Sequence, residues 1–181
     1  MFGDMFKSKP KRQKATKAEM PDLCHCFCND LSKTFFSEYS VKKLAFHLDH
    51  LNESDRETVI FSIIAFFDAM ISYALYTKQW GDVVMGYKAL RGKHLDTIMP
   101  SDQAAKYFDR TDRVCLSMKA DIEKKNSIPE TSEGIVTIAT EHFQSKELIE
   151  MRPAVQAFIT AILSSVIVET YGFLDRWEVA S

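Results

Sequence analysis

The sequence predicts an all-α fold, a single-domain helical bundle of about six or seven helices, and three observations support this prediction. Hydrophobic residues make up 46% of the 181 residues, with 13 Phe and 8 Met, which is enough for a core without disulfides or metals. Gly and Pro number only 6 and 5, whereas an all-β fold needs many turns. Apolar residues recur at three- and four-residue spacing over long stretches, which is the period of an amphipathic helix.

The N-terminal segment 1–19 is predicted as a basic, disordered tail in front of an all-helical domain at 20–181. It carries six Lys and Arg residues against two acids, a pattern typical of a solvated segment. Phe2, Met5 and Phe6 precede the basic run, so the alternative is a tail that touches an anionic surface, such as a membrane or nucleic acid. The whole chain has a net charge of -2, so no specific nucleic-acid binding is predicted.

The expected compartment is the cytoplasm. No apolar stretch of the secretory type follows the first residues, because a basic run comes there instead. The four cysteines are therefore expected to be reduced thiols.

Start signals and periodicity predict seven helices after the tail. Pro21 suits a first helical turn, where Asp22 adds a favourable charge. Ser54 and Glu57 stand at the spacing of a capping box. Pro153 is expected to open the last helix. The expected helices span 21–39, 41–51, 55–79, 83–92, 102–125, 135–151 and 154–177.

The helix expected at 55–79 is apolar on most of its circumference. Such a helix belongs in the middle of a bundle or in an interface. Its apolar run is also close to the length that spans a membrane. Asp68 lies near the centre of the run, where an acid costs about 2.5–3.5 kcal/mol on insertion scales, and we therefore favour the core or interface position.

Residues 23–28, "LCHCFC", concentrate three cysteines and a histidine. On a helix, Cys24 and Cys28 share the apolar face while Cys26 points away, so the three thiols do not converge. Cys24 and Cys28 with His47 and His50 form a possible two-plus-two zinc set, but His47 and His50 do not face one way on the next helix. We favour the interpretation that Cys24 and Cys28 are small core residues, and we predict neither a metal nor a cofactor.

Three ionisable residues, Asp68, His142 and Glu169, lie in or beside apolar helix faces. A buried acid or imidazole needs a hydrogen-bonding partner. We expect these groups to meet one another or a nearby tyrosine, with Tyr73, Tyr107 and Tyr171 as the candidates. The stretch "GYKALRGKH" is expected to form a solvated helix end, with contact to an anion as the alternative.

These observations favour a non-enzymatic cytoplasmic interaction or adaptor protein that self-associates through apolar helix faces, as a homodimer or with a protein partner. The alternative is a binding protein for a small apolar ligand, held in a Phe- and Met-lined pocket between helices. A third hypothesis is an enzyme with a buried His–carboxylate pair. The sequence has no phosphate-binding glycine loop, nucleophile elbow or metalloprotease motif, so no catalytic residue is predicted. The predicted ligand-binding residues are Asp68, His142, Glu169, Phe67, Met70 and Tyr73.

Overall fold

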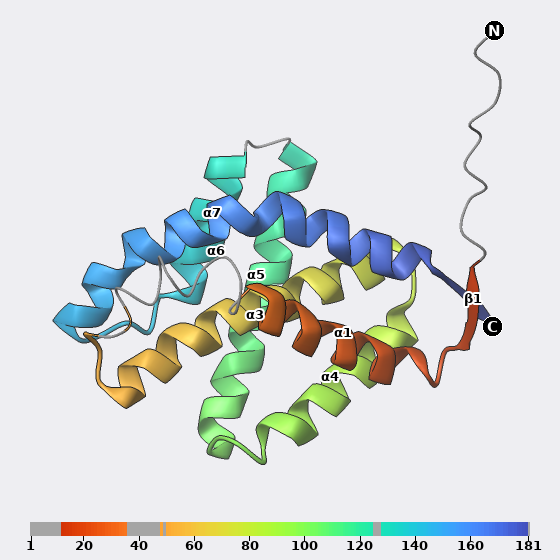
Figure 1. Cartoon of the computed structure of the whole chain (residues 1–181), viewed down its shortest axis with the longest axis horizontal. Helices are drawn as coiled ribbons and strands as arrows, with labels where there is room; N and C mark the ends of the chain where they lie inside the picture. The colour runs from red at the N-terminus through yellow and green to blue at the C-terminus, as the bar shows by residue number, and fades with distance from the viewer. Residues whose placement is uncertain (1–11, 36–47, 49, 125–127, 181) are drawn as a thin grey trace, which may run out of the picture.

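The computed structural model describes residues 12–35, 48, 50–124 and 128–180, and these residues form six helices and two short strands (Figure 1). The all-α prediction is confirmed, with one small sheet added to it. The predicted helix at 41–51 lies almost entirely outside the described residues. The elements are β1 (Gln13–Thr16), α1 (Met20–Thr34), α3 (Glu53–Thr77), α4 (Gly81–Leu95), α5 (Ser101–Lys124), α6 (Ile128–Ala139), α7 (Lys146–Asp175) and β2 (Trp177–Ala180).

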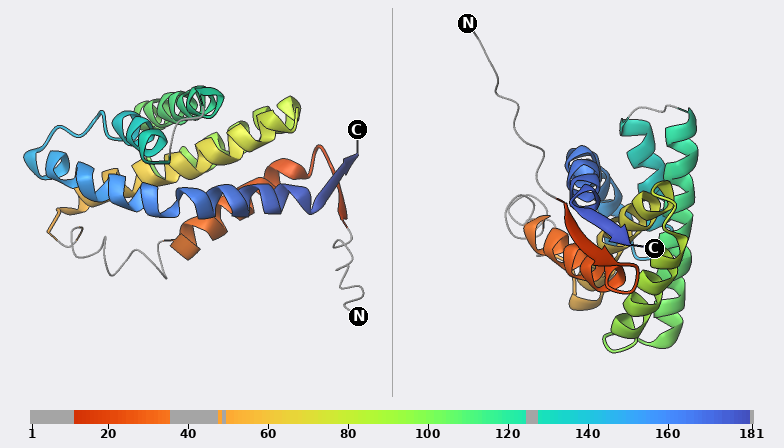
Figure 2. Two further views of the ribbon diagram at one scale, coloured as in Figure 1. Left: turned by 90° about the horizontal axis from the view of Figure 1, so that it is seen from above. Right: turned by 90° about the vertical axis from the view of Figure 1, so that its right-hand side faces the viewer.

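Helix α3 is the central element of the bundle. It packs against α1, α4, α5, α6 and α7, and α5 crosses it steeply (Figures 1 and 2). Between Val59 and Leu75 all but four of its residues are buried. Its neighbours in the same chain therefore account for the apolar side chains around its circumference.

The ends of α3 differ in detail from the predicted ones. Asn52 is the N-cap, and its side-chain oxygen accepts a hydrogen bond from the backbone N–H of Asp55 at 2.9 Å. The capping box predicted at Ser54 is thus wrong, because the cap lies two residues earlier. The helix ends at Thr77, and Gln79 follows with φ of 60°, a left-handed conformation that turns the chain into α4.

Helix α7 is one continuous helix that runs through Pro153, whereas the sequence predicted that Pro153 opens a new helix. Ser145 caps it instead and accepts a hydrogen bond from the Leu148 N–H at 3.1 Å. Proline removes the hydrogen bond to the carbonyl of Ile149, but Pro153 and Ile149 are both exposed, so water can bind that carbonyl. The buried neighbours Met151 and Val155 hold the helix in place.

Strands β1 and β2 pair in parallel at one end of the molecule (Figure 2), with Gln13 opposite Trp177 and Thr16 opposite Ala180. Ala15 is buried and belongs to the main core. The predicted boundary of the tail at residue 19 is therefore wrong, since residues 13–16 pair with the C-terminal strand. Residues 1–11 lie outside the described part of the chain.

Helices α3 and α7 are both long and apolar enough to cross a membrane, judged by length and composition alone. In α3, 78% of the most apolar window is buried inside the protein, and in α7 the share is 39%. The position of α3 in the core is sufficient to explain its composition. Helix α7 lies on the outside of the bundle (Figure 1), which explains its smaller buried share.

Candidate functional site

A buried carboxylate, Asp68 on α3, joins four helices. It receives hydrogen bonds from Arg91 and Tyr87 on α4, from Tyr107 on α5 and from the thiol of Cys28 on α1. We call these five residues the Asp68 cluster. Asp68 and Arg91 are only 2% and 3% exposed. The cluster therefore fixes the relative positions of α1, α3, α4 and α5.

The two oxygens of Asp68 have different partners. Oδ2 accepts from Arg91 Nε at 3.1 Å, from Arg91 Nη2 at 2.9 Å and from the Tyr107 hydroxyl. Oδ1 accepts from the Tyr87 hydroxyl and from Cys28 Sγ at 3.2 Å. Five donors on one carboxylate give a buried charge the compensation that it needs.

Electrostatics keep the donors of the Asp68 cluster protonated. Burial, with the charge of Asp68, raises the pKa of Tyr87, Tyr107 and Cys28 well above their ordinary values. Burial, the largest single effect, would lower the pKa of Arg91, but Asp68 together with Cys28, Tyr87 and Tyr107 raises it by more, and the net shift is upward. None of these four donors is thus a base or a nucleophile at neutral pH, and the hydrogen bonds of the cluster hold the helices together.

The predicted meeting of Asp68, His142 and Glu169 does not occur. Asp68 meets Tyr107, one of the predicted tyrosine partners. His142 lies in the turn between α6 and α7, where the charged groups that affect its pKa are Arg110 and Arg152. Glu169 is exposed on α7, because the buried stripe passes through its neighbour Thr170. The His–carboxylate pair that the enzyme hypothesis requires is therefore not formed by these residues.

Sequence reasoning missed Tyr87 and Arg91 as partners of Asp68. The stretch around Arg91 was expected to form a solvated helix end near Gly92, but α4 continues to Leu95 and Arg91 is buried. The sequence did contain a pattern that indicates a buried Arg91. Val84, Tyr87 and Arg91 lie on one face of α4 at helical spacing, so a charged residue follows two apolar ones on the buried face.

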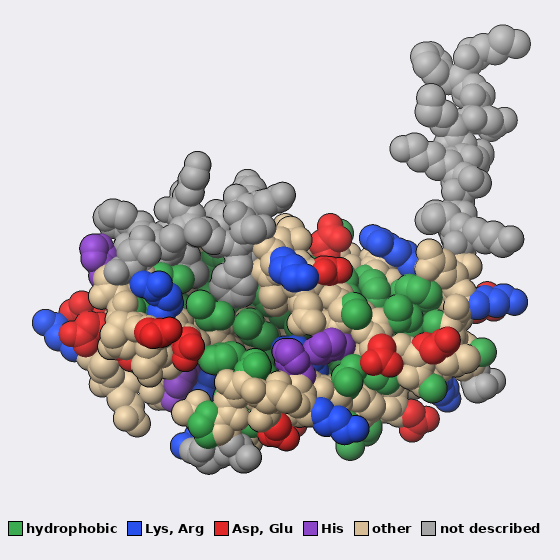
Figure 3. Space-filling model, turned by 60° about the horizontal axis from the view of Figure 1, so that its bottom comes forward, with side chains coloured by type: hydrophobic (Ala, Val, Ile, Leu, Met, Phe, Trp, Pro, Cys, Tyr) green, Lys and Arg blue, Asp and Glu red, His purple; other side chains and the backbone are tan. Residues whose placement is uncertain are grey.

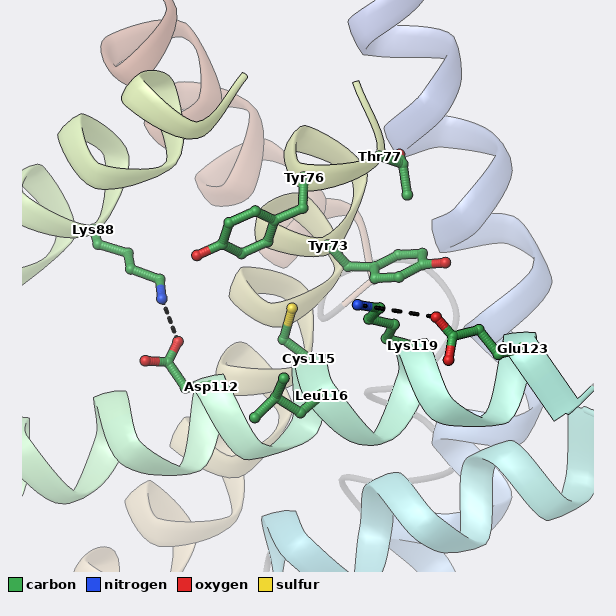
Figure 4. Close-up of a pocket in the computed structure, with 9 residues that line it drawn as sticks. All are labelled: Tyr73, Tyr76, Thr77, Lys88, Asp112, Cys115, Leu116, Lys119 and Glu123. Atoms are coloured by element: carbon green, nitrogen blue, oxygen red, sulfur yellow. Dashed lines mark hydrogen bonds and ion pairs between the residues drawn. The ribbon is translucent and has the colours of Figure 1, made fainter. Parts of the chain in front are cut away.

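A hollow with a volume of about 630 Å³ lies between α3, α4 and α5. Tyr73 and Tyr76 on α3 face Cys115 and Leu116 on α5 across it (Figure 4). We call this hollow the tyrosine groove. It is open to solvent, with Tyr76 48% exposed and Leu116 65% exposed. The groove therefore presents apolar and aromatic surface from two helices.

The charged residues of the tyrosine groove are paired with one another. Lys88 on α4 binds Asp112 on α5, and Lys119 lies 3.9 Å from Glu123 one turn further along α5 (Figure 4). The two pairs lie on opposite sides of the aromatic residues. An occupant of the groove thus meets a surface with no excess charge.

The remaining predicted ligand-binding residues separate into two groups. Tyr73 lines the tyrosine groove. Phe67 and Met70 are fully buried in the core, where they pack with other side chains and line none of the hollows described here.

The cysteine-rich segment 23–28 lies on α1 with Cys24 and Cys28 on its buried face, as the pattern indicated. Cys24 and Cys28 are fully buried core residues and Cys26 is exposed. Burial raises the pKa of Cys24 to about 12. Among the described residues, no three His, Cys, Asp or Glu side chains are placed to share a metal ion, and His47 lies outside them.

On the face of the molecule shown in Figure 3, acidic and basic side chains are interspersed, and hydrophobic side chains gather between them. No broad field of one charge covers that face, which agrees with the net charge of -2. The fold and the site together define an all-α protein with a buried ionic cluster and an open aromatic groove. Comparisons with family models, with curated proteins and with solved structures found no match.

Proposed function

We propose that this chain is a non-enzymatic interaction protein that self-associates, and that the tyrosine groove is its contact surface. The single observation that supports this is the gathering of exposed apolar side chains around an open hollow. Tyr76 and Leu116 line the hollow from two helices. Met85 is 66% exposed and lies one turn before Lys88 on the same side of α4.

The shape and the charge of the tyrosine groove both suit a contact with a protein. Exposed apolar side chains that adjoin one another mark an interaction site more often than single ones do. The Lys88–Asp112 and Lys119–Glu123 pairs leave the rim without unpaired charge, so the groove suits an apolar surface with a polar border. The tyrosine groove of a second copy of this chain is itself an apolar surface with a polar border, so two copies can pair through the same groove.

The sequence predicted self-association from two helices with more apolar surface than a monomer needs on one face each, one of them α3, which is apolar on most of its circumference. In the structure that circumference is buried by the chain's own helices, so it needs no partner. The exposed apolar side chains of the tyrosine groove, and not α3, support the proposal.

Light scattering on the purified protein tests the proposal. The wild-type chain should show a mass above the monomer mass of 20.7 kDa at high micromolar concentration, falling on dilution. Leu116→Asp should give a monomer, because a charge in a desolvated contact is unfavourable. Val168→Asp on α7 is the matched control, since Val168 is 68% exposed against 65% for Leu116 and lies outside the groove.

Two results would contradict this proposal. A wild-type mass of 20.7 kDa at hundreds of micromolar would rule out self-association. An oligomer that survives Leu116→Asp and dissociates with Val168→Asp would move the contact from the groove to α7.

A small apolar ligand in the tyrosine groove is the second candidate function. The volume of about 630 Å³ falls within the range of small-molecule sites, and the predicted residue Tyr73 lines it. Native mass spectrometry should then find an added mass on the wild-type chain that is lost on denaturation and is absent from Leu116→Asp. Two results together would exclude this candidate. The wild-type chain would show no added mass, and a hydrophobic dye would bind the wild type no better than it binds Leu116→Asp.

A further inference from the structure

A second pocket, of about 350 Å³, lies between the N-terminal halves of α3 and α5, whereas the tyrosine groove lies between their C-terminal halves. It is bounded by the first turns of α3, by the first half of α5 and by the turn between α6 and α7. We call it the arginine pocket. Its polar lining residues include Lys106, Arg110, His142, Gln103, Gln144 and Glu57.

Arg110 is the unusual member of this pocket. Its side chain is only 8% exposed, and its Nε atom has no hydrogen-bond partner in the described part of the chain. The nearby acid Glu141 is engaged by Arg113, which donates to it at 2.5 Å. Burial is the main cause that lowers the pKa of Arg110. A buried guanidinium without a close carboxylate is unfavourable unless something else compensates its charge.

His142, in the turn between α6 and α7, also has an unpartnered nitrogen atom, since its Nδ1 is buried and has no partner among the described residues. Burial, Arg110 and Arg152 together lower its pKa to about 4, so the imidazole is neutral at pH 7. Arg110 and His142 thus both line this hollow, and each has a buried nitrogen atom without a hydrogen-bond partner among the described residues. Glu57, the acid of this lining, is exposed.

We propose that the arginine pocket binds a small molecule through a phosphate group, with Arg110 as the principal ligand and His142 as a second donor. A phosphate has several oxygens and accepts donors from several directions, and the donors here come from α5 and the α6–α7 turn.

The pocket leaves room for more than the phosphate. Its remaining wall combines apolar side chains, Phe61 and Met99, with the amides of Gln103 and Gln144. This combination suits an organic phosphate with a compact, partly apolar body. This site is separate from the tyrosine groove, so the proposal of phosphate binding does not depend on whether the protein self-associates.

Thermal unfolding in phosphate tests this site. The wild-type melting temperature is measured in inorganic phosphate, in glycerol 3-phosphate and in chloride of equal ionic strength. We expect a rise of several degrees with either phosphate over chloride. Phosphate also stabilises proteins non-specifically, so the comparison that matters is with Arg110→Met, in which only the non-specific rise should remain. A larger rise with glycerol 3-phosphate indicates an organic ligand, and equal rises indicate free phosphate.

Arg110→Met gives a second readout without any ligand. Removal of a buried charge that Glu141 and Asp109 offset only in part should raise the melting temperature in chloride by roughly 2–4 °C, the opposite of the usual effect of a buried substitution. Lys124→Met, an exposed residue in the last turn of α5 and outside the pocket, is the control that should keep the full response to phosphate. Equal phosphate responses in wild type and Arg110→Met would overturn the proposal, as would a wild type that responds no more to phosphate than to chloride.

Discussion

Arg91 on α4 donates two hydrogen bonds to the same oxygen of Asp68 on α3, from Nε at 3.1 Å and from Nη2 at 2.9 Å. Both side chains are almost completely buried, and the ion pair is the centre of the Asp68 cluster. The positive charge of Arg91 and the negative charge of Asp68 compensate each other. Loss of one leaves the other buried without a counter-charge, which is the costly state.

Asp68→Asn is therefore expected to lower the free energy of unfolding by about 3–5 kcal/mol. The substitution keeps the shape of the side chain but leaves Arg91 as a buried, unpaired cation. Urea unfolding followed by circular dichroism measures the loss. Asp112→Asn is the matched control, because its pair with Lys88 is half-exposed and should be worth about 0–1 kcal/mol. Equal effects of the two substitutions would show that the Asp68 cluster does not stabilise the fold.

Much of the fold could be predicted from the sequence, because helical periodicity is a local signal. It placed Cys24 and Cys28 on the buried face of α1, and it singled out Asp68 as an acid that needs partners. The partners themselves come from helices 19 to 40 residues away along the chain. Tyr107 was among the predicted partners, but no local pattern ranks it above Tyr73.

The errors have local physical reasons. The sequence pattern placed Glu169 on the buried face of the last helix, but the buried residue is the next one, Thr170. Periodicity alone does not separate the centre of a helical face from residues at its edge. The helix expected around His142 is interrupted between Ala139 and Lys146, where Ser145 caps α7. The pairing of β1 with β2 joins segments more than 160 residues apart, and four-residue strands carry little signal of their own.

The four cysteines should differ sharply in reactivity. Cys26 is exposed, whereas burial raises the pKa of Cys24 to about 12 and that of Cys115 to about 11, and burial with the charge of Asp68 raises the pKa of Cys28 well above its ordinary value. The thiolate is the reactive form, so a thiol reagent at pH 8 should modify one cysteine quickly and the other three slowly. Mass spectrometry of the labelled native protein, with a urea-unfolded sample as the control, counts them. Rapid labelling of Cys28 in the native state would mean that the Asp68 cluster opens.

Two glycines in helices should respond in opposite ways to alanine. A Cβ at Gly86 on α4 would lie 2.8 Å from Cγ of Pro21 at the start of α1, whereas nothing lies within 4 Å of a Cβ at Gly172 on α7. Alanine is the better helix former by about 0.5–1 kcal/mol. Gly172→Ala should therefore stabilise the protein by about that amount, and Gly86→Ala should destabilise it because α1 must move away from α4. Chemical unfolding of the two variants gives the sign of each change, and stabilisation by both would mean that the contact between Pro21 and Gly86 is loose.

His142 should make the protein less stable as the pH falls below 6.5. An unfolded chain protonates this imidazole with a pKa near 6.5, while burial, Arg110 and Arg152 lower the folded-state pKa to about 4. Above pH 6.5 the residue is neutral in both states and has no effect. Between pH 6.5 and 4 the unfolded chain binds a proton that the folded chain does not, so the free energy of unfolding decreases, by at most about 1.4 kcal/mol per pH unit.

His142→Gln should remove this contribution, so its stability should fall less steeply than that of the wild type between pH 7 and pH 5. Urea unfolding at several pH values in buffers free of phosphate and sulfate measures both slopes, with His94→Gln, an exposed histidine on α4, as the control. The sequence suggested instead that His142 compensates a buried acid, in which case its removal would strand that acid and cost about 1–3 kcal/mol already at pH 7. In the structure the charged neighbours of His142 are arginines. A loss of that size at pH 7, with an unchanged slope below it, would show that a carboxylate depends on His142 after all.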